Sequence, residues 1–232
     1  MNNLEYILMY YGFPILGLII TSIAQLFITT NYSKYKKVLS KSNKKGCDVA
    51  RKILDKHGLK NVQVESVAGN LTDHYDPTKK VVRLSDDIYN GTSIASVSVA
   101  AHECGHAIQD KIGYTPMRIR SKLVPVVNFS TKIGYIVIMI GVALGALKLA
   151  NIGIILLSTM LMFQIITLPV EFDASRRGKK ELADLNILDP SEQKGSAKML
   201  KAAAFTYVAS VLSTLLQILR FVLMVSARRS RR

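Results

Sequence analysis

Long apolar runs constrain this chain more than any other feature of its sequence. Residues 6–30 contain no charged side chain, and as a helix they can cross a hydrocarbon core about 30 Å thick. A secretory signal peptide is the competing interpretation, but such a peptide has a basic start and a shorter apolar region. Residues 1–5 contain neither Lys nor Arg. We therefore expect residues 6–30 to form an uncleaved transmembrane helix.

Two further regions are apolar enough to enter a bilayer. Between residues 133 and 170 only Lys148 is charged. The stretch is too long for one span, so residues 129–170 are expected to form a transmembrane hairpin with its turn near 148–151. Residues 202–227 are again apolar but carry a polar stripe that includes Arg220. This C-terminal helix either spans the bilayer or lies in its interface, and the basic tail 228–232 is expected in solvent or at lipid headgroups.

The charge distribution is also typical of a membrane protein. The net charge is +15 although 49% of the residues are hydrophobic. Lys and Arg flank the apolar runs rather than alternating with aromatic residues, which disfavours nucleic-acid binding. The positive-inside rule places the region after the first span in the cytoplasm, because that region is dense in lysine: Lys34, Lys36, Lys37, Lys41, Lys44 and Lys45.

The first water-soluble portion is expected at residues 43–122. Its patterns predict an amphipathic helix at 46–57, short strands at 62–67 and 80–84, and a helix capped by Thr92 or Ser93. A second cytoplasmic segment, mostly helical, is expected at 171–201. The two cysteines form no disulfide framework, which suits a reducing compartment.

The last helix of the first soluble portion carries the sequence His102-Glu103-Cys104-Gly105-His106. Residues four apart lie one above the other on a helix, so His102 and His106 present both imidazoles to one point. Two imidazoles at this spacing suit a catalytic zinc, and Glu103 lies close enough to take a proton from a zinc-bound water. The alternative is an ordinary buried helix that happens to carry two histidines.

A third ligand is expected to be a carboxylate, since the chain has only four histidines. Glu171 follows the predicted hairpin, and two spans return the chain to the side of the membrane that carries His102. A purely structural role for Glu171 is the alternative. Asp173 and Arg176 cluster with Glu171 and could support the site, although Arg176 could equally pair with a lipid phosphate. His74 lies in a polar loop, where it could donate to an oxyanion or stabilise a turn.

Residues 70–77, 81–85, 99–109 and 171–176 together resemble the YugP-type membrane zinc metallopeptidases of bacteria. More distantly, they are similar to HtpX-type and CAAX-prenyl gluzincin endopeptidases. The resemblance implies one Zn²⁺ held by His102, His106 and Glu171, with Glu103 as general base. The HtpX-type pattern has Asp four residues after its Glu, whereas Ser175 stands there in this chain. The YugP-type pattern Glu-Phe-Asp-Ala-Ser fits as it stands.

These observations predict an α-helical integral membrane protein with a small α+β zincin-like cytoplasmic catalytic unit. The expected location is the bacterial cytoplasmic membrane, with several spans and the active site facing the cytoplasm. The expected function is zinc-dependent hydrolysis of peptide bonds in membrane or membrane-proximal proteins, with a substrate strand added along residues 81–84. A non-proteolytic zinc-binding signalling or scaffold protein is the alternative. The expected partners are a protein or peptide substrate and the lipid bilayer, and the sequence carries no signal for an oligomeric state.

Overall fold

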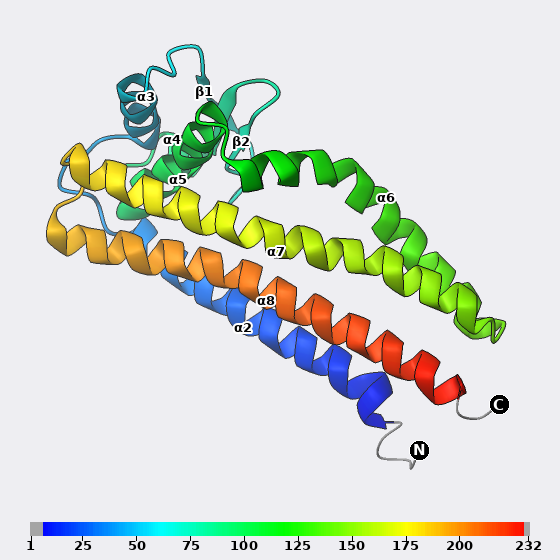
Figure 1. Ribbon diagram of the computed structural model, residues 1–232. Coiled ribbons are helices and arrows are strands. Elements are labelled where there is room, and N and C mark those ends of the chain that lie inside the picture. Colours follow the sequence, from blue (N-terminus) through cyan, green and yellow to red (C-terminus); the bar gives the residue numbers. More distant parts are fainter. Residues whose placement is uncertain (1–6, 230–232) are drawn as a thin grey trace. The chain divides into compact units, whose positions relative to one another are not determined.

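The computed structural model describes residues 7–229 and is mostly helical (Figure 1). Position 6 and residues 230–232, which belong to the predicted first span and basic tail, lie outside the described residues. The elements are η1 (Leu8–Gly12, a π-helix), α2 (Phe13–Lys36), α3 (Gly46–Lys56), β1 (Gln63–Val67), β2 (His74–Asp76), β3 (Val81–Ser85), α4 (Asp86–Tyr89), α5 (Ile94–Lys111), α6 (Thr115–Ala143), α7 (Leu147–Asp184) and α8 (Pro190–Arg229).

Four helices of the described chain are long and apolar enough to cross a membrane. They cover Tyr10–Lys36, Thr115–Ala143, Leu147–Asp184 and Pro190–Ala227. Many of their large apolar side chains are exposed, including Phe129 and Ile155, each 68% exposed. An apolar surface of this kind is stable in lipid and costly in water. The expected helical fold with apolar spans is confirmed at this level.

The chain divides into two compact units. The first comprises residues up to 25, residues 119–168 and residues from 205 onward. Its core is formed by Ile138, Ala150, Ile154 and Leu157 together with side chains near the end of α8. The second comprises residues 26–118 and 169–204, and it contains the sheet, the short helices and all of the candidate site.

The hairpin between α6 and α7 turns at residues 144–146, earlier than the expected turn at 148–151. Gly145 has a φ of +66°, which glycine adopts without steric cost. Lys148 lies in the first turn of α7, where a good helix former continues the helix rather than ending it.

The second unit is built on a three-stranded sheet with the order β1-β3-β2. β3 pairs in parallel with β1 and antiparallel with β2. The predicted strands at 62–67 and 80–84 therefore exist, each within one residue of its expected bounds. The expectation that a substrate strand pairs with residues 81–84 is wrong, because β3 is the central strand and its two edges are already occupied.

Helix α5 packs on this sheet with most of its residues buried. Ser93 caps the start of α5, because its hydroxyl accepts a hydrogen bond from the Ser96 amide at 3.1 Å, so the predicted cap is confirmed. Cys104 is fully buried in α5, and its thiol lies 3.5 Å from the Ala50 carbonyl of α3. Burial raises the pKa of this thiol, which identifies Cys104 as a packing residue.

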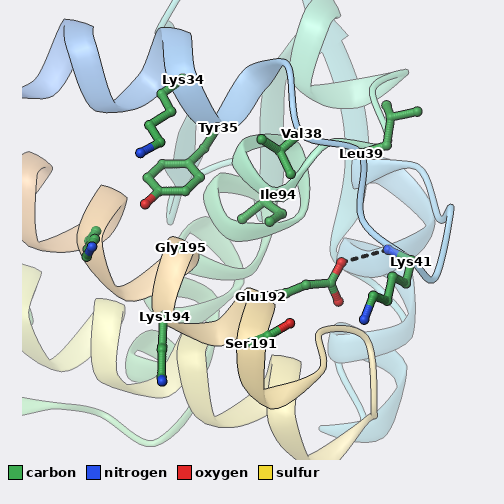
Figure 2. Close-up of a pocket in the computed structure, with 11 residues that line it drawn as sticks. Lys34, Tyr35, Val38, Leu39, Lys41, Ile94, Ser191, Glu192, Lys194 and Gly195 are labelled. Atoms are coloured by element: carbon green, nitrogen blue, oxygen red, sulfur yellow. Dashed lines mark hydrogen bonds between the residues drawn. The ribbon is translucent and has the colours of Figure 1, made fainter.

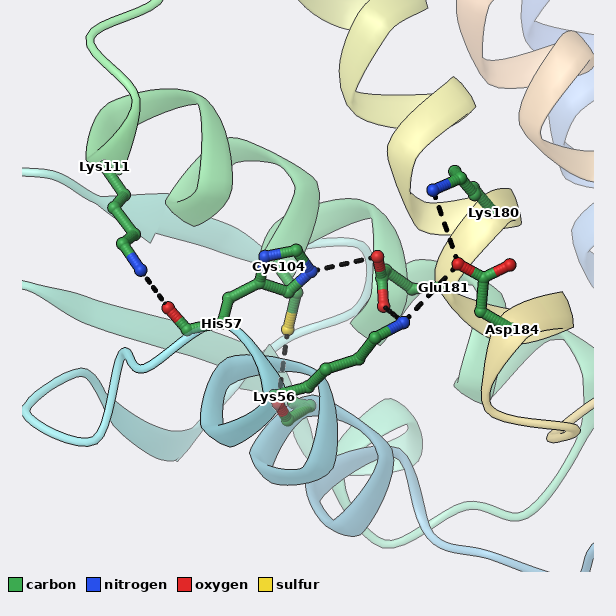
Figure 3. Close-up of polar contacts among 8 residues, drawn as sticks. Lys56, His57, Cys104, Lys111, Lys180, Glu181 and Asp184 are labelled. Atoms are coloured by element: carbon green, nitrogen blue, oxygen red, sulfur yellow. Dashed lines mark hydrogen bonds and ion pairs between the residues drawn. The ribbon is translucent and has the colours of Figure 1, made fainter.

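An ion-pair cluster joins α3 to the end of α7 (Figure 3). The Glu181 side chain is only 6% exposed, and its two oxygens lie 2.7 Å from Lys56 Nζ and 2.9 Å from His57 Nε2. Asp184 Oδ2 forms ion pairs with the Nζ atoms of Lys56 and Lys180, each at 3.4 Å. The last part of α7 is thereby fixed against α3 in the second unit.

Candidate metal centre

Two glycines allow α5 and α7 to approach each other at backbone distance. A Cβ atom on Gly105 would lie 2.5 Å from the Ala174 carbonyl oxygen. A Cβ atom on Gly178 would lie 2.8 Å from the Ala101 carbonyl oxygen. Because no side chain separates the two backbones at these points, residues one turn before Ala174 on α7 reach the histidines of α5.

His102, His106 and Glu171 meet at one point. Each offers one ligand atom, and these atoms all lie within 4.8 Å of one another. Glu171 Oε2 is 3.3 Å from His102 Nε2 and 3.5 Å from His106 Nε2. Zinc bonds of about 2.1 Å directed to tetrahedral corners separate neighbouring ligand atoms by about 3.4 Å. The chemistry and spacing of these donors therefore fit a zinc ion.

The remaining imidazole nitrogens are held by hydrogen bonds. His102 Nδ1 lies 3.1 Å from Ser175 Oγ, and His106 Nδ1 lies 3.0 Å from Gln109 Oε1. When each Nδ1–H donates to these oxygens, both Nε2 atoms keep a lone pair directed at the shared point. Partners of this kind orient metal-ligating histidines and make them more basic.

Gln109 extends this network to α7. Its side chain is fully buried, and its amide donates to the Val170 carbonyl at 2.8 Å and to Asp173 Oδ2 at 3.0 Å. Asp173 also accepts hydrogen bonds from Arg176 and Arg177. The sequence predictions did not include Gln109. A signal was present, since a glutamine three residues after His106 falls on the same buried face of the helix.

Glu103 is buried beside the three candidate ligands and is only 7% exposed. Burial and the nearby Glu171 carboxylate raise the pKa of Glu103 to about 7, against the opposing effect of His102. The backbone N–H of Tyr75 acts in the opposite direction and lowers this pKa, which places β2 beside the carboxylate. A carboxyl group with a pKa near neutrality suits proton transfer in both directions.

The other candidate residues lie around this centre. His74 is exposed on β2, and its Nδ1 lies 2.8 Å from the Thr72 carbonyl, which stabilises the preceding turn. Arg176 is exposed and pairs with Asp173. Asp173 is two hydrogen bonds away from His106, through Gln109. Within the described residues, His102, His106 and Glu171 are the one group of such side chains close enough to share a metal ion.

Residues 10–226 match the family model described as "putative neutral zinc metallopeptidase". The chain belongs to this zinc metallopeptidase family. A curated relative, "Putative membrane protease YugP" of Bacillus subtilis (strain 168), is 48% identical over 200 residues, which cover 86% of this chain and 89% of the relative. The resemblance expected from the sequence is thereby confirmed. No solved structure matches the chain.

Membership in the zinc metallopeptidase family agrees with the donor set on α5 and α7. Two imidazoles and a carboxylate are a ligand set used by zinc peptidases. The relative's description as a membrane protease, together with the four apolar helices, indicates a membrane protein.

Proposed function

We propose that this chain is a membrane-embedded zinc endopeptidase that hydrolyses peptide bonds of membrane or membrane-proximal proteins. The observation that carries the proposal is the convergence of His102, His106 and Glu171 at ligand spacing, with the buried carboxylate of Glu103 beside them. Three protein ligands leave the fourth position of a zinc site open for water, as catalysis requires and as closed structural sites do not allow.

Different residues of the chain have different roles in such a reaction. His102, His106 and Glu171 hold one Zn²⁺, while Ser175 and Gln109 orient the two imidazoles. Zinc, when bound, lowers the pKa of a water molecule toward neutrality and polarises the scissile carbonyl. Glu103 accepts the proton of the attacking water on its carboxylate and delivers it to the departing amine.

Substrate is proposed to bind along β2 rather than β3. β2 pairs with β3 on one side only, and the backbone N–H of its Tyr75 lies close enough to Glu103 to affect the pKa of that carboxyl group. An extended peptide that pairs with the free edge of β2 would therefore pass close to the general base. The spans would restrict this substrate to segments near the membrane, and the lysines after the first span favour a site on the cytoplasmic side.

The variant Glu103→Gln tests the reaction directly. It removes the base but keeps the size and polarity of the side chain, so the purified full-length protein should retain zinc. Cleavage of a casein-like substrate should fall by about 10²–10⁴-fold. Glu65→Gln, an exposed change on β1, is the matched control and should cleave normally.

Two results would contradict the proposal. One is a Glu103→Gln protein that cleaves as fast as the parent. The other is a parent protein that binds zinc but cleaves nothing, which would favour a signalling or scaffold role. Zinc content after Glu171→Ala tests the ligand set separately, because unchanged zinc affinity would exclude Glu171 as a ligand.

A further inference from the structure

The second unit contains a pocket of about 480 Å³ that is separate from the metal centre. Figure 2 shows Lys34 and Tyr35 from the end of α2 on one side and Ser191 to Gly195 from the start of α8 on the other. None of the lining residues is a candidate metal ligand or a partner of one. The pocket therefore needs an explanation of its own.

The charge of the pocket is strongly positive. Four lysines line it against a single carboxylate, Glu192. That carboxylate is already used, because it accepts hydrogen bonds from the backbone amides of Lys41 at 2.7 Å and Asp189 at 3.0 Å. Lys34, Lys194 and Lys198 are exposed, and within the described part of the chain no carboxylate pairs with them. Their ammonium groups are available to an anion.

The same pocket has an apolar wall. The ring of Tyr35 packs against Gly195, where an added Cβ would lie 2.8 Å from ring atom Cε1. Val38 and Leu39 also line the pocket and are 42% and 67% exposed. A free inorganic anion gains nothing from such a wall, whereas an amphipathic anion buries its apolar part there.

The positions of the pocket lysines along the chain agree with an amphipathic ligand, because these lysines lie at the ends of apolar helical segments. Lys34 lies in the last turn of the apolar helix α2. Lys198 lies about one turn before the apolar run that starts at Ala202. Lysines at the ends of spans reach the headgroup layer, which is about 5–8 Å thick on each side of the hydrocarbon core. Basic pockets between helices at this depth recognise anionic headgroups.

We propose that this pocket binds the headgroup of an anionic phospholipid. The phosphate would lie among the ammonium groups of Lys34, Lys194 and Lys198. The glycerol and the first acyl carbons would lie against Val38 and Leu39. The ligand class is therefore a lipid phosphate with an attached apolar chain, distinct from the peptide substrate of the metal centre.

The double variant Lys194→Gln/Lys198→Gln tests the electrostatic part of this proposal. The full-length protein in mild detergent is titrated with phosphatidylglycerol, and one-to-one adducts are counted by native mass spectrometry. From the typical contribution of a lysine near an anionic surface, we expect the double variant to bind about 30-fold more weakly. The matched control is Lys52→Gln/Lys60→Gln, which removes the same charge at exposed positions outside the pocket and should bind as the parent does.

The variant Leu39→Asn distinguishes a lipid from free phosphate. We expect it to weaken phosphatidylglycerol binding and to leave binding of inorganic phosphate unchanged. Three outcomes would overturn the proposal: equal weakening in the control pair, equal binding of phosphatidylcholine, or full lipid binding by Leu39→Asn with displacement by millimolar phosphate. Zinc content should match the parent in every variant, so failure here is distinguishable from failure of the metal centre.

Discussion

The orientation of His106 depends on one fully buried polar side chain, Gln109. This amide uses its oxygen for the imidazole and its nitrogen for Val170 and Asp173, so it connects α5 to α7 at the metal centre. A buried glutamine is stable only when its polar atoms are paired, and here each pairing also orients a part of the site. At the residue scale, Gln109 therefore contributes to the geometry of the centre as directly as the candidate ligands do.

Replacement of Gln109 by leucine keeps the volume of the side chain and removes these hydrogen bonds. We expect zinc affinity, measured by competition with a chelator, to fall by about 10–100-fold. The free energy of unfolding should also fall by about 1–3 kcal/mol, because buried partners lose their hydrogen bonds. Gln63→Leu, an exposed change on β1, is the control. Parent-like zinc affinity in Gln109→Leu would show that His106 is oriented by packing alone.

Ser175 occupies the corresponding position beside His102, where the HtpX-type pattern has an aspartate. Ser175→Ala removes the acceptor for Nδ1–H, and we expect zinc affinity to fall about tenfold. Ser175→Asp supplies a stronger acceptor, so it should bind zinc at least as tightly as the parent. The same chelator competition measures both variants. An aspartate variant that binds more weakly than the alanine variant would rule out an orienting role for this position.

At the scale of elements, the site depends on how closely two helices approach. Gly105 and Gly178 place α5 and α7 in backbone contact, and the candidate ligands from the two helices meet at that separation. We expect a larger residue at either glycine to push the two helices apart and to disturb the spacing of the candidate ligands.

The variant Gly178→Ala tests this contact, because the contact decides whether the substitution raises or lowers the free energy of unfolding. In an exposed helix this change stabilises by up to about 1 kcal/mol. Here the added Cβ meets the Ala101 backbone, so we expect a loss of about 1–3 kcal/mol in unfolding free energy and weaker zinc binding. Denaturant unfolding followed by a spectroscopic probe measures the first quantity. Lys179→Ala on the same helix is the control, and stabilisation by Gly178→Ala would disprove the steric contact.

The sequence predicted correctly those elements that are defined by the residues within them. It did not predict the features that depend on contacts between segments distant in sequence. The helix of His102 and its cap at Ser93 were readable from spacing and residue type. β2 was missed because three residues with polar His74 and Asp76 carry no alternating pattern and form a strand only by pairing with β3. The roles of Gly105 and Gly178 were also unreadable, because each glycine faces a backbone distant in sequence.

At the scale of the whole molecule, the number of spans between His106 and Glu171 decides whether the candidate ligands lie on the same side of the membrane. His106 and Glu171 are separated by the hairpin of α6 and α7. Two crossings return the chain to its starting side, whereas one would separate the candidate ligands by the bilayer. The sequence predicted this arrangement by counting apolar runs, but the turn position depended on the backbone of Gly145.

Cysteine labelling tests the proposed orientation. In a Cys47→Ser background, Leu144→Cys lies in the exposed hairpin turn, and Lys60→Cys lies between α3 and β1. A membrane-impermeant maleimide should label Leu144→Cys in intact cells. It should label Lys60→Cys only after the membrane is permeabilised. The reversed pattern would place the metal centre outside the cell, against the positive-inside prediction.

The placement of the ligands on α5 and α7 also has a consequence for biosynthesis. During translation, about 65 residues must be added after His106 before Glu171 exists, which takes about 3–13 s at 5–20 residues per second. With the proposed topology, both arms of the hairpin are inserted before Glu171 can reach the histidines. A nascent or prematurely terminated chain therefore holds only two of the three candidate metal ligands. If the proposed site and spans are correct, the order of synthesis itself delays assembly of the candidate metal centre until the protein is anchored in a membrane.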